Sequence, residues 1–186
     1  TPKELPTLIK EPETPQKSSK PSSTSKSAQK APQSSPRSLH NKIKNLHKRA
    51  QEGDPNAQYA LAACYSIGEG VERDKKKGFE YYLKAADQGL PNAQFAVASG
   101  YSYGRGTKMD KSKAFEFYLK AAKQGHDKSQ YAVGHFYDYG LGGQEQDHEK
   151  AVYWYKLAAE QGHEAAMDEL KSGSGEGATT LTLDAN

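Results

Sequence analysis

The sequence predicts an all-α protein, an α/α superhelical solenoid of helix–turn–helix repeats that follows a disordered N-terminal tail. Three observations support this class. A block of about three dozen residues occurs three times in succession, and each block holds two helical apolar patterns joined by a glycine turn. Proline and glycine are also separated, because seven of the nine prolines lie in the first 36 residues and all seventeen glycines lie from Gly53 onward.

The N-terminal residues 1–36 consist mainly of Pro, Ser, Thr and Lys. They hold almost no apolar side chains, so they cannot bury enough surface to offset the entropy of ordering. Charge divides along the same line. Residues 1–50 carry eleven Lys and Arg against three Asp and Glu, whereas residues 51–186 carry fifteen against twenty. We therefore predict a basic disordered tail and a mildly acidic folded part.

The folded part is predicted to cover residues 37–171. Its first helix is indicated by apolar residues at helical spacing, from Leu39 to Ala50, and ends at Gly53. Three repeat units follow, at 56–91, 92–127 and 128–164, and the third has one extra residue near Gly142. The segment EAAMDELK predicts a last short helix to about Lys171, and residues 172–186 are predicted to be a flexible tail.

Each unit carries its own start and stop signals. The first helix begins near Pro55 or Pro91, where a missing N–H costs nothing, and runs to a Y-x-x-G-x-G turn whose glycines permit positive φ. The second helix begins behind an aspartate that caps its free N–H groups and ends at a glycine with a left-handed conformation. The aspartates are Asp74, Asp110 and Asp147, and the glycines are Gly89, Gly125 and Gly162.

The second helices share an apolar template at positions i, i+3, i+4, i+7 and i+8. Aromatic residues alternate there with glycine and alanine, which let neighbouring helices approach closely. Such an alternation in the same register is typical of a stacked solenoid. The template residues are Gly78, Tyr81, Tyr82, Ala85 and Ala86, then Ala114, Phe117, Tyr118, Ala121 and Ala122, then Ala151, Trp154, Tyr155, Ala158 and Ala159.

The combined motif is AQ-aromatic, then Y-x-x-G-x-G, then D-x-x-K-A followed by aromatic residues and A-A-x-Q-G. It closely resembles the Sel-one-like repeat, a relative of the tetratricopeptide repeat, over roughly Ala50 to Lys171. The resemblance implies a superhelix with a concave groove that serves as an adaptor in protein complexes and signalling. It also supplies an alternative, because some cysteine-rich members are described as cell-wall enzymes and some fungal members regulate chitin synthase. The disulfide cysteines of the cysteine-rich branch are missing here, where Cys64 is the single cysteine.

A polar and aromatic stripe on the first helices is predicted to line the concave groove. It would form an aromatic ladder with polar selectivity toward a partner segment. Under the alternative interpretation, the aromatic residues pack between repeats and the groove is more polar. The stripe residues are Tyr59, Ala63, Ser66, Phe95, Ser99, Ser102, Tyr131, His135 and Asp138.

Catalytic and metal chemistry have no candidate residues in this sequence. Cys64 lies on the apolar side of its helix and is predicted to be a buried, inert thiol. His126 and His163 recur in Q-G-H turns without nearby cysteine or paired histidine, so surface turns are favoured over metal ligands. The glycine turn lacks the strand and the Lys-Ser/Thr of a phosphate loop. No cofactor is expected.

The sequence thus favours a non-enzymatic adaptor or scaffold that binds a protein partner in its groove. The alternatives are a cell-wall enzyme or its regulator, and a binder of anionic surfaces through the basic tail, without reading of nucleic-acid sequence. Thr14 and Ser35 precede prolines and are candidate phosphorylation sites. No segment is long and apolar enough to span a membrane. We expect a cytoplasmic or nuclear protein, and the open ends of a short array make self-association an option.

Overall fold

The computed structural model describes residues 36–173, and within that range it contains eight α-helices and no strand. The predicted N-terminal tail, Thr14, Ser35 and most of the predicted C-terminal tail lie outside the described residues. The fold class is confirmed: the described part is a stack of helical hairpins. The helices are α1 (Pro36–Gln51), α2 (Pro55–Ile67), α3 (Lys75–Asp87), α4 (Pro91–Tyr103), α5 (Lys111–Lys123), α6 (Asp127–Asp138), α7 (His148–Glu160) and α8 (Glu164–Gly173).

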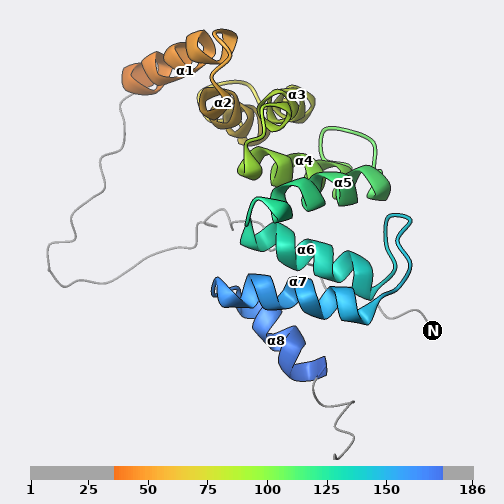
Figure 1. Cartoon of the computed structure of the whole chain (residues 1–186). Coiled ribbons are helices and arrows are strands. Elements are labelled where there is room, and N and C mark those ends of the chain that lie inside the picture. The colour runs from red at the N-terminus through yellow and green to blue at the C-terminus, as the bar shows by residue number, and fades with distance from the viewer. Residues whose placement is uncertain (1–35, 174–186) are drawn as a thin grey trace, which may run out of the picture. The chain divides into compact units, whose positions relative to one another are not determined.

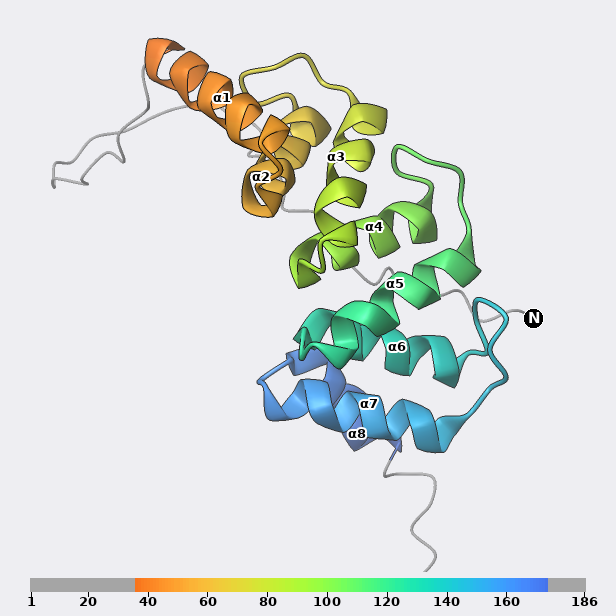
Figure 2. The same ribbon diagram turned by 45° about the horizontal axis from the view of Figure 1, so that its top comes forward.

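Each helix packs against the next one along the chain, from α1 to α8 (Figures 1 and 2). α2, α4 and α6 are the first helices of the three units, and α3, α5 and α7 are their second helices. α1 and α8 lie at opposite ends of this stack (Figure 1). The buried apolar residues form three successive clusters along the stack, as expected for a solenoid.

The helix boundaries agree with the predicted caps. The side chains of Asp74, Asp110 and Asp147 each accept a hydrogen bond from the backbone N–H three residues later, at 2.9, 3.0 and 2.9 Å. Beyond the second helices, Gly89, Gly125 and Gly162 adopt φ of 89°, 86° and 88°. Local sequence therefore sets where each second helix begins and ends.

A glutamine pair joins each unit to the unit before it. In the second unit the buried side chain of Gln94 donates from Nε2 to the carbonyl of Ala86 at 3.4 Å, and its Oε1 accepts from Gln124 Nε2 at 2.8 Å. The first and third units repeat this geometry with Gln58 and Gln88, and with Gln130 and Gln161. The A-Q and Q-G motifs are thus the two halves of one hydrogen-bonded link.

The second glycine of each Y-x-x-G-x-G turn sits against the preceding unit. A Cβ on Gly106, which has φ of 75°, would collide with the backbone carbonyl of Lys75. A Cβ on Gly142 would lie 2.6 Å from the corresponding carbonyl of Lys111. These glycines supply both the left-handed backbone conformation and the room that two units need to meet.

The predicted apolar template is only partly the core. Its small residues Ala85, Ala114 and Ala151 are fully buried, and Gly78 packs tightly against α2. The template omitted Phe79 and Phe115, which are buried, whereas Tyr81, Phe117 and Trp154 are only half-buried. Each second helix contacts both its own first helix and the first helix of the next unit, so its buried face is wider than one stripe.

Candidate functional site

The predicted stripe lies on α2, α4 and α6, and its aromatic residues pack against the second helix of the same unit. Tyr59 and Phe95 are half-buried, and Tyr131 is 8% exposed. Each ring contacts a tyrosine of the template, with ring centroids 5.3 Å apart for Tyr59–Tyr82, 5.7 Å for Phe95–Tyr118 and 5.5 Å for Tyr131–Tyr155. These aromatics therefore have a packing role, and a role in binding a partner stays a prediction.

The polar members of the stripe differ in exposure. Ser99, Ser102 and His135 are buried, at 8%, 4% and 3% exposed. Ala63, Ser66 and Asp138 are half-buried. The stripe as predicted thus presents little side-chain surface in the second unit and more at the ends of α2 and α6.

The histidines of the Q-G-H turns are helix caps, which corrects the expectation of surface turns. Nδ1 of His126 accepts from the backbone N–H of Ser129 at 3.2 Å, and Nδ1 of His163 accepts from that of Ala166 at 3.3 Å. His126 also contacts Phe95 with ring centroids 5.0 Å apart, and burial lowers its pKa. Both histidines are half-buried between consecutive units.

The surface that sequence reasoning missed is one residue further along each first helix. Ile67, Tyr103 and Tyr139 stand 36 residues apart, and each directly precedes the first glycine of its turn. They are 67%, 40% and 43% exposed, among the most exposed large apolar side chains of the described residues. We call these three residues the exposed apolar row. A large apolar residue before the turn glycine in every unit was the available signal.

Basic groups border this row in the second unit. The guanidinium of Arg105 lies 5.1 Å from the centre of the Tyr103 ring, and the ammonium of Lys111 lies 5.4 Å from it. Lys111 also donates to the hydroxyl of Ser102 at 3.1 Å. The row therefore changes character from apolar at Ile67 to aromatic and basic at Tyr103.

Acidic groups border the row in the third unit. Asp138 accepts from Nδ1 of His148 at 3.0 Å, and Tyr139 covers the buried ring of His135 with centroids 4.4 Å apart. Burial lowers the pKa of His135 to about 4, so this imidazole is neutral at physiological pH. On α8, burial and the charge of Asp138 raise the pKa of Glu169.

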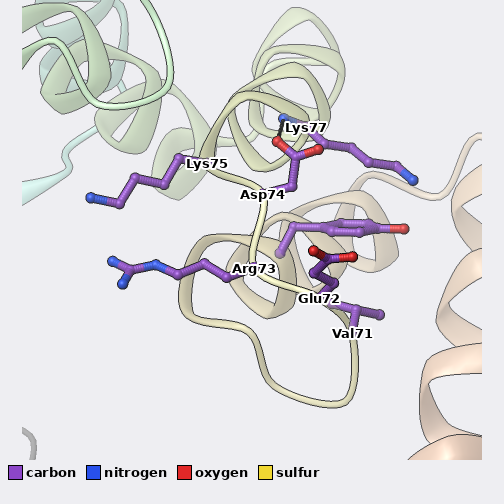
Figure 3. Close-up of a pocket in the computed structure, with 7 residues that line it drawn as sticks. Val71, Glu72, Arg73, Asp74, Lys75 and Lys77 are labelled. Atoms are coloured by element: carbon purple, nitrogen blue, oxygen red, sulfur yellow. Dashed lines mark hydrogen bonds between the residues drawn. The ribbon is translucent and has the colours of Figure 1, made fainter.

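A separate hollow of about 680 Å³ opens beside the turn of the first unit (Figure 3). Tyr65 and Val71 provide its apolar lining, and five charged residues of both signs line the rest. Figure 3 shows Arg73 and Lys75 extending to the same side and Lys77 to the other. The Lys77 ammonium lies 4.4 Å from the centre of the Tyr65 ring, and the hydroxyl of Tyr65 raises its pKa. These charged groups do not converge on one point, so the hollow lacks the geometry of a catalytic site.

Two further findings concern chemistry and membranes. Cys64 is buried and its pKa is raised by that burial, in agreement with an unreactive thiol. Over residues 36–173, no three His, Cys, Asp or Glu side chains group so as to hold a metal ion. No helix in the same part of the chain has the length and apolarity to cross a bilayer.

Fold and surface together define a helical-repeat solenoid of the kind that presents an extended surface. Comparison with known proteins identifies the repeat: the Sel1 repeat family matches residues 55–90, 91–126 and 127–163. The chain belongs to this family. Sel1 repeats are typically protein-interaction scaffolds and are generally non-enzymatic. No curated protein matches the chain.

Solved structures agree with this assignment. A Sel1 repeat protein from Oxalobacter formigenes is 35% identical with a TM-score of 0.66, over 70% of this chain and 97% of that protein. A protective antigen of uropathogenic Escherichia coli with an SLR fold is 35% identical with a TM-score of 0.70, and the match covers 72% of this chain but only 28% of the antigen. Cysteine rich protein B of Helicobacter pylori shares the fold at 24% identity, with a TM-score of 0.53 over 68% of this chain and 96% of that one.

Proposed function

We propose that this protein is an adaptor that binds a segment of a protein partner along its first helices, with the exposed apolar row as the principal contact. The observation that carries the proposal is the row itself. Ile67, Tyr103 and Tyr139 occupy the same place in all three units and are all exposed. Large exposed apolar residues in a regular arrangement are costly in water unless a partner covers them.

The spacing of the row suits an extended or helical segment. Each unit offers one apolar side chain, and the polar groups beside it differ from unit to unit, so the row supports affinity and its flanks support selectivity. The predicted stripe residues Ser66, Ser102 and Asp138 immediately precede the row residues in sequence. Stripe and row thus form one candidate surface.

The proposal is tested with a peptide selected from a random displayed library against the full chain. Its dissociation constant is then measured by fluorescence anisotropy for wild type and for the triple variant Ile67→Ser, Tyr103→Ser, Tyr139→Ser. We expect the triple variant to bind at least tenfold more weakly while keeping its helical circular dichroism. Replacement of exposed aromatic and apolar anchors is known to cost this much at interfaces.

Tyr153 on α7 provides the matched control, because it is 58% exposed but belongs to a second helix. Tyr153→Ser should change the dissociation constant by less than twofold. Unchanged binding by the triple variant, equal loss in Tyr153→Ser, or failure to select any peptide would each contradict the proposal.

A further inference from the structure

The same buried tyrosine of the second helix has a different environment in the second and third units. In the second unit, the hydroxyl of Tyr118 lies 3.2 Å from the hydroxyl of Ser99, and the two share a hydrogen bond. In the third unit the equivalent residues are Tyr155 and His135. There the hydroxyl of Tyr155 is buried and has no hydrogen-bond partner.

His135 carries the second unsatisfied atom of this region. Its side chain is 3% exposed, and Nε2 is buried without a partner. Buried polar atoms are nearly always satisfied, so two such atoms in one unit indicate that a further hydrogen-bonding group, either water or a group of a bound partner, meets them. These are the only buried side-chain atoms without a partner among the described residues.

Two carboxylates stand at the same place. Asp138 follows His135 by one turn of α6, and Glu169 comes from α8. Burial raises the pKa of Tyr155 and of Tyr139, and the charges of Asp138 and Glu169 raise both further, so the carboxylates lie near the two phenols. The three complete units have an alanine at the position of Glu169, namely Ala60, Ala96 and Ala132. The acidic charge is therefore specific to the junction of α6, α7 and α8.

The cationic groups near this junction do not neutralise its two carboxylates. His148 contacts Asp138 from the exposed side, and its ring is charged only if protonated. Besides burial, the charge of Lys111 in the preceding unit lowers the pKa of His135, but the Lys111 ammonium donates its hydrogen bond to Ser102. Tyr139 adds an aromatic face, since its ring is partly exposed and lies on that of His135.

We infer that His135, Asp138, Tyr139, Tyr155 and Glu169 form a binding site for an arginine side chain of the partner segment. A guanidinium has five N–H donors in one plane, which suits two carboxylates and further acceptors at Tyr155 and His135. Its flat face also stacks on an aromatic ring such as Tyr139. A lysine ammonium is a compact charge with three donors and would leave more of these acceptors unsatisfied.

The arginine is assigned to a partner and not to the tail of this chain. Residues 1–35 contain six lysines and no arginine. The inference rests on the proposed function, because it names the chemistry that the third unit recognises in the bound segment. It also gives the segment a direction, since the basic groups Arg105 and Lys111 border the second unit and the carboxylates border the third.

The site is tested with three short probes, acetyl-Gly-Ser-Arg-Ser-Gly-amide and its lysine and citrulline counterparts. Each is titrated into the full chain while the ring signals of His135 and Tyr155 are followed by NMR. We expect saturable shifts with the arginine probe, and apparent dissociation constants at least fivefold higher with lysine or citrulline. Glu169→Gln should weaken the arginine probe at least fivefold, whereas Glu160→Gln, at the exposed end of α7, should leave it unchanged.

Each contrary result has a definite meaning. Equal binding of the citrulline probe, equal binding of the lysine probe, or no saturable shift would overturn the arginine site, and the last result would assign the two unsatisfied atoms to internal water. The double variant Ile67→Ser, Tyr103→Ser separates this outcome from the proposed function. If that variant loses the selected peptide while Glu169→Gln keeps it, the exposed apolar row stands and the arginine site falls.

Discussion

The second and third units share the same helical hairpin and have different polar interiors. Both have an aspartate cap, a glycine turn and a buried glutamine at equivalent positions. They differ beside the buried tyrosine of the second helix, where Ser99 and Ser102 of α4 are replaced by His135 and Asp138 of α6. The second unit satisfies its buried tyrosine and the third does not. Residues that join units are thus repeated, whereas the polar residues around the buried tyrosine vary from unit to unit.

The largest effect on stability is expected at the turn glycine that packs against the preceding unit. Gly106→Ala should lower the free energy of unfolding by about 3 kcal/mol or more. The new Cβ would be strained by the left-handed backbone conformation and would also collide with the carbonyl of Lys75. Gly125→Ala has the same sign of φ but nothing within 4 Å, so it should cost about 1 kcal/mol. Urea unfolding measures both values, and equal losses would mean that the contact between units is soft.

The next largest effect is expected from a loss of stability at acid pH, which depends on His135 of the third unit. Because burial holds the pKa of His135 at about 4 against 6.5 for an unburied imidazole, the unfolded state takes up a proton first as pH falls. The contribution of this neutral imidazole to the free energy of unfolding is complete above pH 6.5 and is lost as the pH falls from about 6.5 to 4. At pH 4.5 the loss amounts to about 2 to 3 kcal/mol.

His135→Ser copies the second unit and should remove most of this acid sensitivity. Urea unfolding at pH 7 and pH 4.5 gives the comparison, and His126, whose pKa is also lowered by burial, is present in both proteins. The same loss in wild type and variant would show that His135 does not control the effect.

The glutamine link should be worth less than the glycine contact and should be alike in both units. Gln94→Ala leaves the carbonyl of Ala86 without its side-chain donor and removes the partner of Gln124, so we expect a loss of about 2 kcal/mol. Gln124→Ala removes an exposed side chain and should cost less than about 1 kcal/mol. A double-mutant cycle between them measures their coupling, which should be close to zero if the link does not form.

The smallest effect has opposite sign in the two units. Tyr118→Phe breaks a buried hydrogen bond with Ser99 and should cost about 1 kcal/mol. Tyr155→Phe removes a hydroxyl without a partner and should be neutral or stabilising by up to about 1 kcal/mol. Thermal unfolding of both variants provides the test, and a clear destabilisation by Tyr155→Phe would mean that its hydroxyl is satisfied in solution.

The ends of the stack show how far the pattern of the units extends. The outer face of α1 carries Lys42, Asn45 and Arg49, all exposed, at the positions that correspond to Gly78, Tyr81 and Ala85 of α3. At the other end, Lys171 of α8 corresponds to Ala62, which packs tightly against Gly78 in the first unit. Polar residues thus replace the small and apolar ones that receive a further helix, as in the terminal repeats of solenoids.

The sequence alone determined the helices, their caps and the period of the units. These features depend on contacts within a few residues, as the bond from Lys113 to Asp110 illustrates, and such contacts can be read from spacing. It also located the stripe on the first helices, but it placed His126 and His163 on the surface and overlooked Ile67, Tyr103 and Tyr139.

Only the tertiary structure decided which of these side chains face water and which polar atoms lack a partner. The exposure of Tyr139 and the lack of a hydrogen-bond partner at Tyr155 depend on how α7 packs against α6 and α8. A helical wheel describes one helix and its faces, whereas burial in a solenoid is set by the helices that precede and follow it in the stack.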